Sequence, residues 1–336
     1  TPETIKAISK LVKGRAPLRR QVSEGGELLV EEVPAGPPAV EPAPGDFFQK
    51  LGKQFVATCE LDPPKGPDAR GAVEAARLLK QAGAGAVDIA DNPMARVRLS
   101  SMALAHFVRQ ETGLSTILHM TCRDRNLLGL QSELLGASLL GVEGILCLSG
   151  DPASLGDFPA ATSVNDVNVV GLIRIVRSLN GGLDFSNNSI GTPTAFAIGA
   201  GVSLNPADPD KEIEKLRQRA DAGATFAMSQ PVFRLEDAER FLERAARIPV
   251  HILPGVLPLA SLKQALYLHN EVPGMSLPKD LLARLEALGT REDQMALGVD
   301  LARSLLAGLR ALAPGAYLTA GGRKAAALAE VLQGLR

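Results

Sequence analysis

The sequence contains no tryptophan and only two tyrosines among its 336 residues, and 36 basic against 37 acidic residues give a formal net charge of -1. Proteins that bind nucleic acids need a basic surface and aromatic side chains on which bases can stack. The composition therefore excludes nucleic acid as a partner. Cysteine is also scarce. The three cysteines are an odd number set in apolar stretches, which argues against a disulfide framework and is typical of a reducing compartment.

Features typical of several other protein classes are missing as well. No apolar run is long enough to cross a membrane and the first residues show no signal-peptide pattern, so we expect a cytoplasmic protein with no membrane partner. No cysteine or histidine spacing is typical of a metal site, so no metal is expected. Neither GxGxxG after the first apolar strand nor GxxxxGK is found, so any phosphate group must be bound by other means.

The amino-terminal part differs in composition from the rest of the chain. Residues 1–15 place apolar side chains at helical spacing before a basic end, which predicts a helix. Residues 33–45 contain five prolines and two glycines in thirteen positions, which is typical of an extended linker. We expect residues 1–15 to be the carboxyl-terminal tail of a preceding domain, residues 16–46 to be a linker, and residues 47–336 to form one domain.

Short apolar runs in this domain alternate with amphipathic stretches at helical spacing. The runs predicted as strands are 54–60, 86–89, 115–119, 144–148, 194–198, 226–229, 251–253 and 316–318. In two segments, 77–91 and 216–230, a helix is followed by a glycine suited to positive φ and then by a buried strand. Eight strands alternating with helices predict the α/β class and a closed (βα)8 TIM barrel. An open doubly wound sheet is the alternative, which the missing GxGxxG motif disfavours.

Polar residues stand at the carboxyl ends of several predicted strands, which is the end of a TIM barrel that carries the active site. They are Glu60, Asp91, Asn92, His119, Thr121, Ser149, Gly150, Asp151, Ser229 and Gln230. Each has an ordinary explanation alone, because strand-end carboxylates are usually solvated, Gly-Asp-Pro suits a tight turn, and a histidine on an apolar strand is usually a hydrogen-bonded core residue. Four separate strands nevertheless bring different polar groups to one face. We therefore predict an active site there, with Glu60 as a general acid whose pKa is raised by partial burial.

Charged residues flank this face in two further segments. The loop 123–125 (Arg-Asp-Arg) is either a mutual salt-bridge cluster or, together with the amino end of the next helix, a phosphate-binding group for an anionic cofactor. Glu212, Lys215 and Arg219 share one face of a predicted helix, which offers the same two interpretations. A solvated helix face is the default for the second segment.

Three motifs resemble the methylenetetrahydrofolate reductases, a family of flavin-dependent barrels in one-carbon metabolism. They are HMTCRDRN from residue 119, LSGDP from residue 148 followed by GDFPAATSV from residue 156, and MSQPVF from residue 228. The similarity runs from about Phe48 to Arg336 and is greatest to the branch fused behind a homocysteine S-methyltransferase domain, whose end residues 1–15 resemble. The resemblance implies that domain as a fused or associated partner. It does not imply methyl transfer by these residues, which lack the zinc-binding cysteines of that domain.

The resemblance also implies roles for individual residues. Glu60 is similar to the proton donor that opens the five-membered ring of the substrate, Asp151 to a carboxylate beside both flavin and pterin, and Gln230 to an amide that binds the pterin. Matches to FAD-binding positions are His119, Ser149, Gly150, Asp151, Ser163, Val164, Glu212, Lys215 and Arg219, and Arg323 joins Asp151 and Gln230 as a substrate-binding residue. Two residues depart from other branches, because Ser149 replaces an arginine and Ala90 replaces a flavin-contacting threonine.

The implied reaction is the reduction of 5,10-methylenetetrahydrofolate to 5-methyltetrahydrofolate by NAD(P)H through bound FAD in a ping-pong order, which supplies methyl groups for methionine synthesis. The choice between NADH and NADPH stays open, as does the formation of a homo-oligomer. Two other functions also stay open: a non-catalytic or regulatory barrel partner of the fused methyltransferase, and a flavin-free pterin-binding methyltransferase barrel.

Overall fold

The computed structural model of the chain describes residues 46–272, 275–320 and 325–335. Residues 1–45, with the predicted tail helix and nearly all of the predicted linker, lie outside this range. Arg323, the third predicted substrate-binding residue, lies outside it as well.

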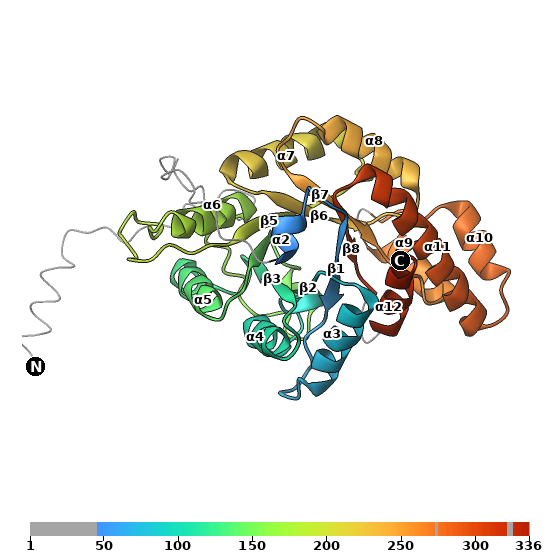
Figure 1. Cartoon of the computed structure of the whole chain (residues 1–336), viewed down its shortest axis with the longest axis horizontal. Coiled ribbons are helices and arrows are strands. Elements are labelled where there is room, and N and C mark those ends of the chain that lie inside the picture. Colours follow the sequence, from blue (N-terminus) through green and yellow to red (C-terminus); the bar gives the residue numbers. More distant parts are fainter. Residues whose placement is uncertain (1–45, 273–274, 321–324, 336) are drawn as a thin grey trace, which may run out of the picture.

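Eight parallel strands close into a barrel (Figure 1). In chain order they are β1 (Val56–Leu61), β2 (Ala86–Ile89), β3 (Ser115–Thr121), β4 (Gly144–Leu148), β5 (Ala197–Val202), β6 (Phe226–Pro231), β7 (His251–Val256) and β8 (Gly315–Leu318). Each strand pairs with the next, and β8 pairs with β1. The predicted (βα)8 TIM barrel of the α/β class is confirmed, and the alternative of an open sheet is wrong.

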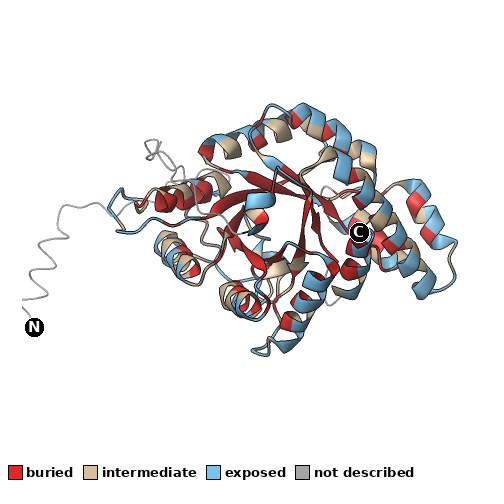
Figure 2. Ribbon diagram, in the orientation of Figure 1, coloured by how far each residue is buried: buried red, intermediate tan, exposed pale blue. Residues whose placement is uncertain are grey.

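Helices cover the outside of the barrel, and Figure 2 shows their buried residues on the sides that face the strands. They are α3 (Arg70–Ala82), α4 (Ser101–Thr112), α5 (Leu127–Leu139), α6 (Val169–Asn180), α7 (Pro209–Ala222), α8 (Leu235–Ala245), α9 (Leu262–Glu271), α10 (Lys279–Glu286), α11 (Arg291–Leu312) and α12 (Ala325–Gln333), with 3-10 turns η1 (Pro93–Ala95) and η2 (Ala153–Leu155). As predicted, glycines end two of them in the region of positive φ that favours glycine: Gly83 has φ 110° and Gly223 has φ 126°. The last helix, α12, packs against α3 and α11 of the same chain.

A short helix, α2 (Asp46–Lys50), covers the amino-terminal end of the barrel (Figure 1). Phe47 is 1% exposed and packs among the side chains that fill the barrel interior, and the ring centroid of Phe48 lies 5.3 Å from that of Phe226. Asp46 belongs to this helix and pairs with Lys50. Because α2 covers one end, the carboxyl ends of the strands form the accessible end of the barrel.

Strand β5 lies three to four residues later than the predicted 194–198. The buried side chain of Asn180 explains the difference, because it accepts hydrogen bonds from the hydroxyl of Thr194 and the amide of Phe196 and donates to the carbonyl of Phe196. These groups are therefore bound to the end of α6 rather than to a neighbouring strand. The true strand contains Gly199 and Gly201, residues of low strand propensity.

Packing against Gly199 gives the first testable prediction. A Cβ atom at this position would lie 2.3 Å from Cζ of Phe226, a fully buried ring. We expect Gly199→Ala to lower the free energy of unfolding, measured by urea titration, by about 1–3 kcal/mol because the closed barrel leaves no room for the added methyl group. Gly71→Ala, at an exposed position of α3 with no atom within 4 Å, is the matched control and should be neutral or slightly stabilising. Equal stabilities of the two variants would contradict this packing.

Candidate active site

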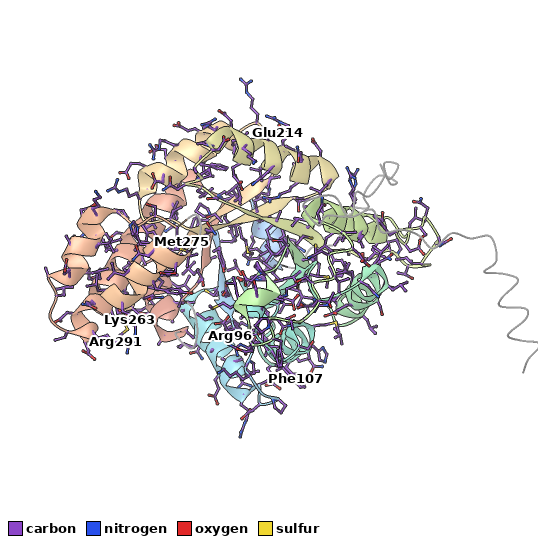
Figure 3. All side chains as sticks on the ribbon, turned by 180° about the vertical axis from the view of Figure 1, so that it is seen from behind. Arg96, Phe107, Glu214, Lys263, Met275 and Arg291 are labelled. Atoms are coloured by element: carbon purple, nitrogen blue, oxygen red, sulfur yellow. The ribbon has the colours of Figure 1, made fainter. Side chains whose placement is uncertain are left out.

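A cavity of about 730 Å³ opens at the carboxyl ends of the strands. Its lining includes these predicted residues: Glu60, His119, Ser149, Gly150, Asp151, Glu212, Arg219 and Gln230. A second cavity of about 610 Å³ shares Ser149, Gly150, Asp151 and Arg219 with the first and adds Ser163 and Lys215. Figure 3 views the molecule from behind relative to Figure 1 and labels Met275, another lining residue of the first cavity. The structure brings these groups together at one mouth, with Glu212, Lys215 and Arg219 contributed by α7 rather than by a strand, while their roles stay predictions.

Glu60 stands near the end of β1, beside Asp88 of β2, its partner in the strand register. Burial raises the pKa of Glu60 to about 8, the negative charge of Asp88 adds to the increase, and the positive character of His119 opposes it. A side-chain hydrogen bond with Thr319 of the loop after β8 also acts on this carboxyl group. Glu60 therefore holds a proton at neutral pH, which is what a general acid requires.

His119 lies between the cavity and a buried polar group of the barrel interior. Its Nε2 atom is 3.1 Å from Oδ1 of Asp88, and Oδ2 of Asp88 accepts a 2.7 Å hydrogen bond from the hydroxyl of Thr58. Burial alone would lower the pKa of His119, but the hydrogen bond and the charges of Asp88 and Glu60 raise it. Our sequence reasoning missed Asp88 and Thr58. Their signal is the period of two along each strand, which places both on the interior face with Glu60.

The loop 123–125 is a salt-bridge cluster, and its arginines are already neutralised. The guanidinium of Arg125 donates to both oxygens of Asp91 at 2.7 and 3.2 Å and also pairs with Glu133. Arg123 is 3% exposed and pairs with Asp124 at 2.7 Å. These contacts favour the structural interpretation of the loop over the phosphate-binding one, because little positive charge is left for an anionic ligand.

Arg219 is the better-placed cation, since it lines both cavities. It donates to the carbonyl oxygen of Gly201, while the carboxylate of Glu212 is 3.8 Å away and accepts from the amide of Ser203. Burial lowers the pKa of Arg219, which indicates that nearby negative charge only partly compensates the guanidinium. Lys215 is half-exposed, 3.4 Å from Glu212 and part of the second cavity wall. This helix face is therefore a cavity wall, and the default interpretation as solvated surface is wrong for Arg219.

Asp151 connects two loops at the mouth. Its carboxylate accepts a 2.8 Å hydrogen bond from the amide of Met94, and its carbonyl oxygen accepts one from Arg123. Met94 and its neighbours Asn92 and Ala95 all have positive φ, so this short segment stores backbone strain. The predicted FAD-binding residue Val164 lies nearby and donates its amide to the carbonyl of Arg123 at 2.8 Å, although it does not line either cavity.

Gln230 reaches the cavity from an irregular part of β6. The register against β7 shifts between Met228 and Pro231. The hydroxyl of Ser229 bridges this irregularity, because it donates to the carbonyl of Gln230 and accepts from the amide of Gly255, both at 2.7 Å. Such bulges change the direction of side chains next to functional sites.

The residues that the structure describes contain no group of three or more histidine, cysteine or acidic side chains placed to hold a metal ion. Within the same residues, no helix has the length and apolar character needed to cross a membrane.

Comparison with known proteins shows a family match over most of the chain. Residues 48–318 match the family model described as methylenetetrahydrofolate reductase. The chain is 28% identical over 203 residues to a Caenorhabditis elegans protein named probable methylenetetrahydrofolate reductase (NADPH), and 24% identical over 186 residues to the 5,10-methylenetetrahydrofolate reductase of Buchnera aphidicola. The alignments cover 58% and 54% of this chain but only 28% and 57% of those two relatives.

A similar fold occurs among solved structures. A Clostridium thermocellum protein, described as uncharacterized and as binding two copies of 5-methyl-5,6,7,8-tetrahydrofolic acid, superposes with a TM-score of 0.59. The superposition covers 85% of this chain and 96% of that one at 13% identity, so the likeness concerns the fold alone.

Proposed function

The chain belongs to the methylenetetrahydrofolate reductase family, and we propose that it reduces 5,10-methylenetetrahydrofolate to 5-methyltetrahydrofolate with NADH or NADPH as donor and FAD as bound cofactor. One observation carries the proposal. Glu60, whose pKa is raised to about 8, opens into the same cavity as Asp151 and Gln230, which come from different strands. A protonated carboxyl beside an acceptor and an amide suits acid-assisted chemistry on a pterin.

The two joined cavities fit FAD. Their volumes fall within the usual range of about 300–1,000 Å³ for ligand sites, and the two cavities share part of their lining. Gly150, which lines both cavities, has φ 86°, and a Cβ there would lie 3.0 Å from Cβ of Thr121, so a larger residue would strain this part of the wall. Arg219 and Lys215 would neutralise the diphosphate, while His119, Ser149 and Ser163 would hold the rest of the cofactor. Bound FAD would carry the hydride from NAD(P)H to the folate.

The side chains of the chain would handle the proton. Glu60 donates its proton to the bridging nitrogen of the substrate, so that the five-membered ring opens to an iminium whose methylene carbon accepts the hydride. Gln230 hydrogen-bonds the pterin ring and sets its orientation. Asp151 lies beside the pterin and keeps the loop of Met94 in place. NAD(P)H and folate would use the same cavity in turn, which is the origin of the ping-pong order.

The proposal extends to the surroundings of the chain. We propose residues 1–15 as the tail of a homocysteine S-methyltransferase domain and residues 16–46 as the linker, on the sequence similarity described above. The three cysteines, all buried and unpaired, support a cytoplasmic location. Assay of homocysteine methylation by the full-length protein would test the fusion.

Three measurements on the purified protein test the reaction. We expect a yellow flavin spectrum with FAD released on denaturation, oxidation of NADH or NADPH with menadione as acceptor, and conversion of methylenetetrahydrofolate. Comparing NADH with NADPH also assigns the donor. Folate binding without flavin would favour a flavin-free methyltransferase barrel. Absence of flavin, electron transfer and folate binding together would favour a non-catalytic partner of the methyltransferase.

A further inference from the structure

Asp88 is a fully buried carboxyl group in the barrel interior. The interior of a TIM barrel is normally filled by branched apolar side chains, and burying a charge is costly unless it is hydrogen-bonded. Most of the interior follows that rule, with Ile117, Leu146 and Leu253 among the packed residues. Asp88 does not line either cavity of the candidate site, so it does not touch a ligand there.

Its two contacts lead directly to the candidate site. Oδ2 accepts from the hydroxyl of Thr58, and Oδ1 lies 3.1 Å from Nε2 of His119. On the other side, Asp88 is the register partner of Glu60. Both His119 and Glu60 line the first cavity. Asp88 is thus placed directly behind two residues of the cavity wall.

We propose that Asp88 is a positioning residue for the reaction, which orients His119 and places a negative charge behind the carboxyl group of Glu60. The inference rests on the proposed function and deepens it, because it says how the chain prepares its proton donor. Neither family membership nor the similarity of motifs assigns a role to this position.

The first effect concerns the tautomer of His119. A carboxylate only accepts hydrogen bonds, so the Nε2 atom that faces Asp88 carries hydrogen. Nδ1 is then the ring nitrogen available to the cavity, and in neutral His119 it is a hydrogen-bond acceptor. The hydroxyl of Thr58 occupies the other oxygen of Asp88 and prevents the carboxyl group from rotating freely.

The second effect concerns the proton on Glu60. The charged or polar groups around Glu60 are Asp62 on its own segment, Asp88 on β2, His119 on β3 and Thr319 after β8. After burial, repulsion by Asp88 is the largest influence on the pKa of Glu60, and it exceeds the attraction by His119. Loss of the charge at residue 88 should therefore make Glu60 lose its proton at lower pH.

The test compares wild type with Asp88→Asn, a variant of nearly the same shape. The rate at which methylenetetrahydrofolate reoxidises the reduced protein is measured as a function of pH. We expect the alkaline limb of this pH profile to lie about one pH unit lower in Asp88→Asn than in wild type. We also expect 15N NMR to show hydrogen on Nε2 of His119 in wild type and on Nδ1 in the variant, whose amide nitrogen faces the ring. His119 should titrate at lower pH in the variant. With four histidines in the chain, its signals can be assigned.

Asp62→Asn is the matched control, because Asp62 raises the pKa of Glu60 less than Asp88 does and is not among the groups that shift the pKa of His119. It should move the alkaline limb less than Asp88→Asn does and leave the His119 spectrum unchanged. Should Asp88→Asn fail to fold, Asp88→Ser removes the same charge with less volume, and the tautomer in wild type is itself a test. A uniform loss of rate with no shift of the limb, or hydrogen on Nδ1 of His119 in wild type, would overturn the proposal. Absence of folate turnover in wild type would refute the proposed function, while the NMR result would still decide the role of Asp88.

Discussion

Glu60→Gln is expected to slow the reduction of methylenetetrahydrofolate by about 10²- to 10⁴-fold, the usual contribution of a general acid. Glutamine keeps the size of the side chain and can still hydrogen-bond Thr319, but it has no proton to donate to the bridging nitrogen. NAD(P)H oxidation needs no such proton and should stay close to wild type. Stopped-flow absorbance of the two half-reactions measures both rates separately.

The control for this prediction is Glu74→Gln on the exposed side of α3, which removes a carboxylate that lines neither cavity and should change neither half-reaction. Equal losses in both half-reactions of Glu60→Gln would assign Glu60 to cofactor binding rather than to proton donation. An unchanged folate reaction would remove Glu60 from the mechanism.

Glu60→Gln also offers a test that does not depend on enzymatic activity. Burial and Asp88 raise the pKa of Glu60 in the folded protein to about 8 from its ordinary value of 4.5, so the folded state binds the proton more tightly than the unfolded state. The stabilisation this provides is complete below pH 4.5 and is lost as the pH rises through about 8. Glu60→Gln lacks this loss, so its stability relative to wild type should rise between pH 5 and pH 9 by an amount on the order of 4 kcal/mol. Urea titrations at pH 5 and 9 measure it, and a difference independent of pH would contradict the raised pKa.

Arg125→Met is expected to lower the free energy of unfolding by about 3–5 kcal/mol, because it leaves two acidic groups without their cation in a poorly solvated site. The side chain of Asp91 is 3% exposed, and those of Arg125 and Glu133 are 17% and 22% exposed. Asp91 also accepts hydrogen bonds from the amide and hydroxyl of Thr121, so it cannot turn toward solvent without breaking these. Urea titration near pH 7 measures the effect.

Arg234→Met is the matched control for this ion pair. Arg234 pairs with Asp280 at 2.9 Å, but their side chains are 52% and 69% exposed. Exposed pairs contribute about 0–1 kcal/mol, so this variant should unfold almost as wild type does. Similar losses in the two variants would mean that the Arg125 cluster is no more important to stability than a surface ion pair.

Much of the candidate site could be predicted from the sequence because the signals were local. Apolar runs that alternate with amphipathic stretches, and glycines between a helix and the next strand, identified the strands. The TIM barrel then required the carboxyl ends of the strands to meet. Glu60, Asp151 and Gln230 could be placed at one mouth on that basis alone. The loop 123–125 could not be decided in the same way, because its pairing with Asp91 and Glu133 joins segments that are not adjacent in the chain.

The sequence by itself determined the order of elements, the end of the barrel that carries the site and the polar residues at that end, since each depends on residue spacing within one segment. Only the tertiary structure decided which groups pair across strands. The contact of Asp88 with Thr58 and His119 spans 30 and 31 residues, and it exists because barrel closure sets the register of β1, β2 and β3. The position of β5 was decided by Asn180 in the same manner. Such contacts depend on the register between strands, which a pattern within one strand does not contain.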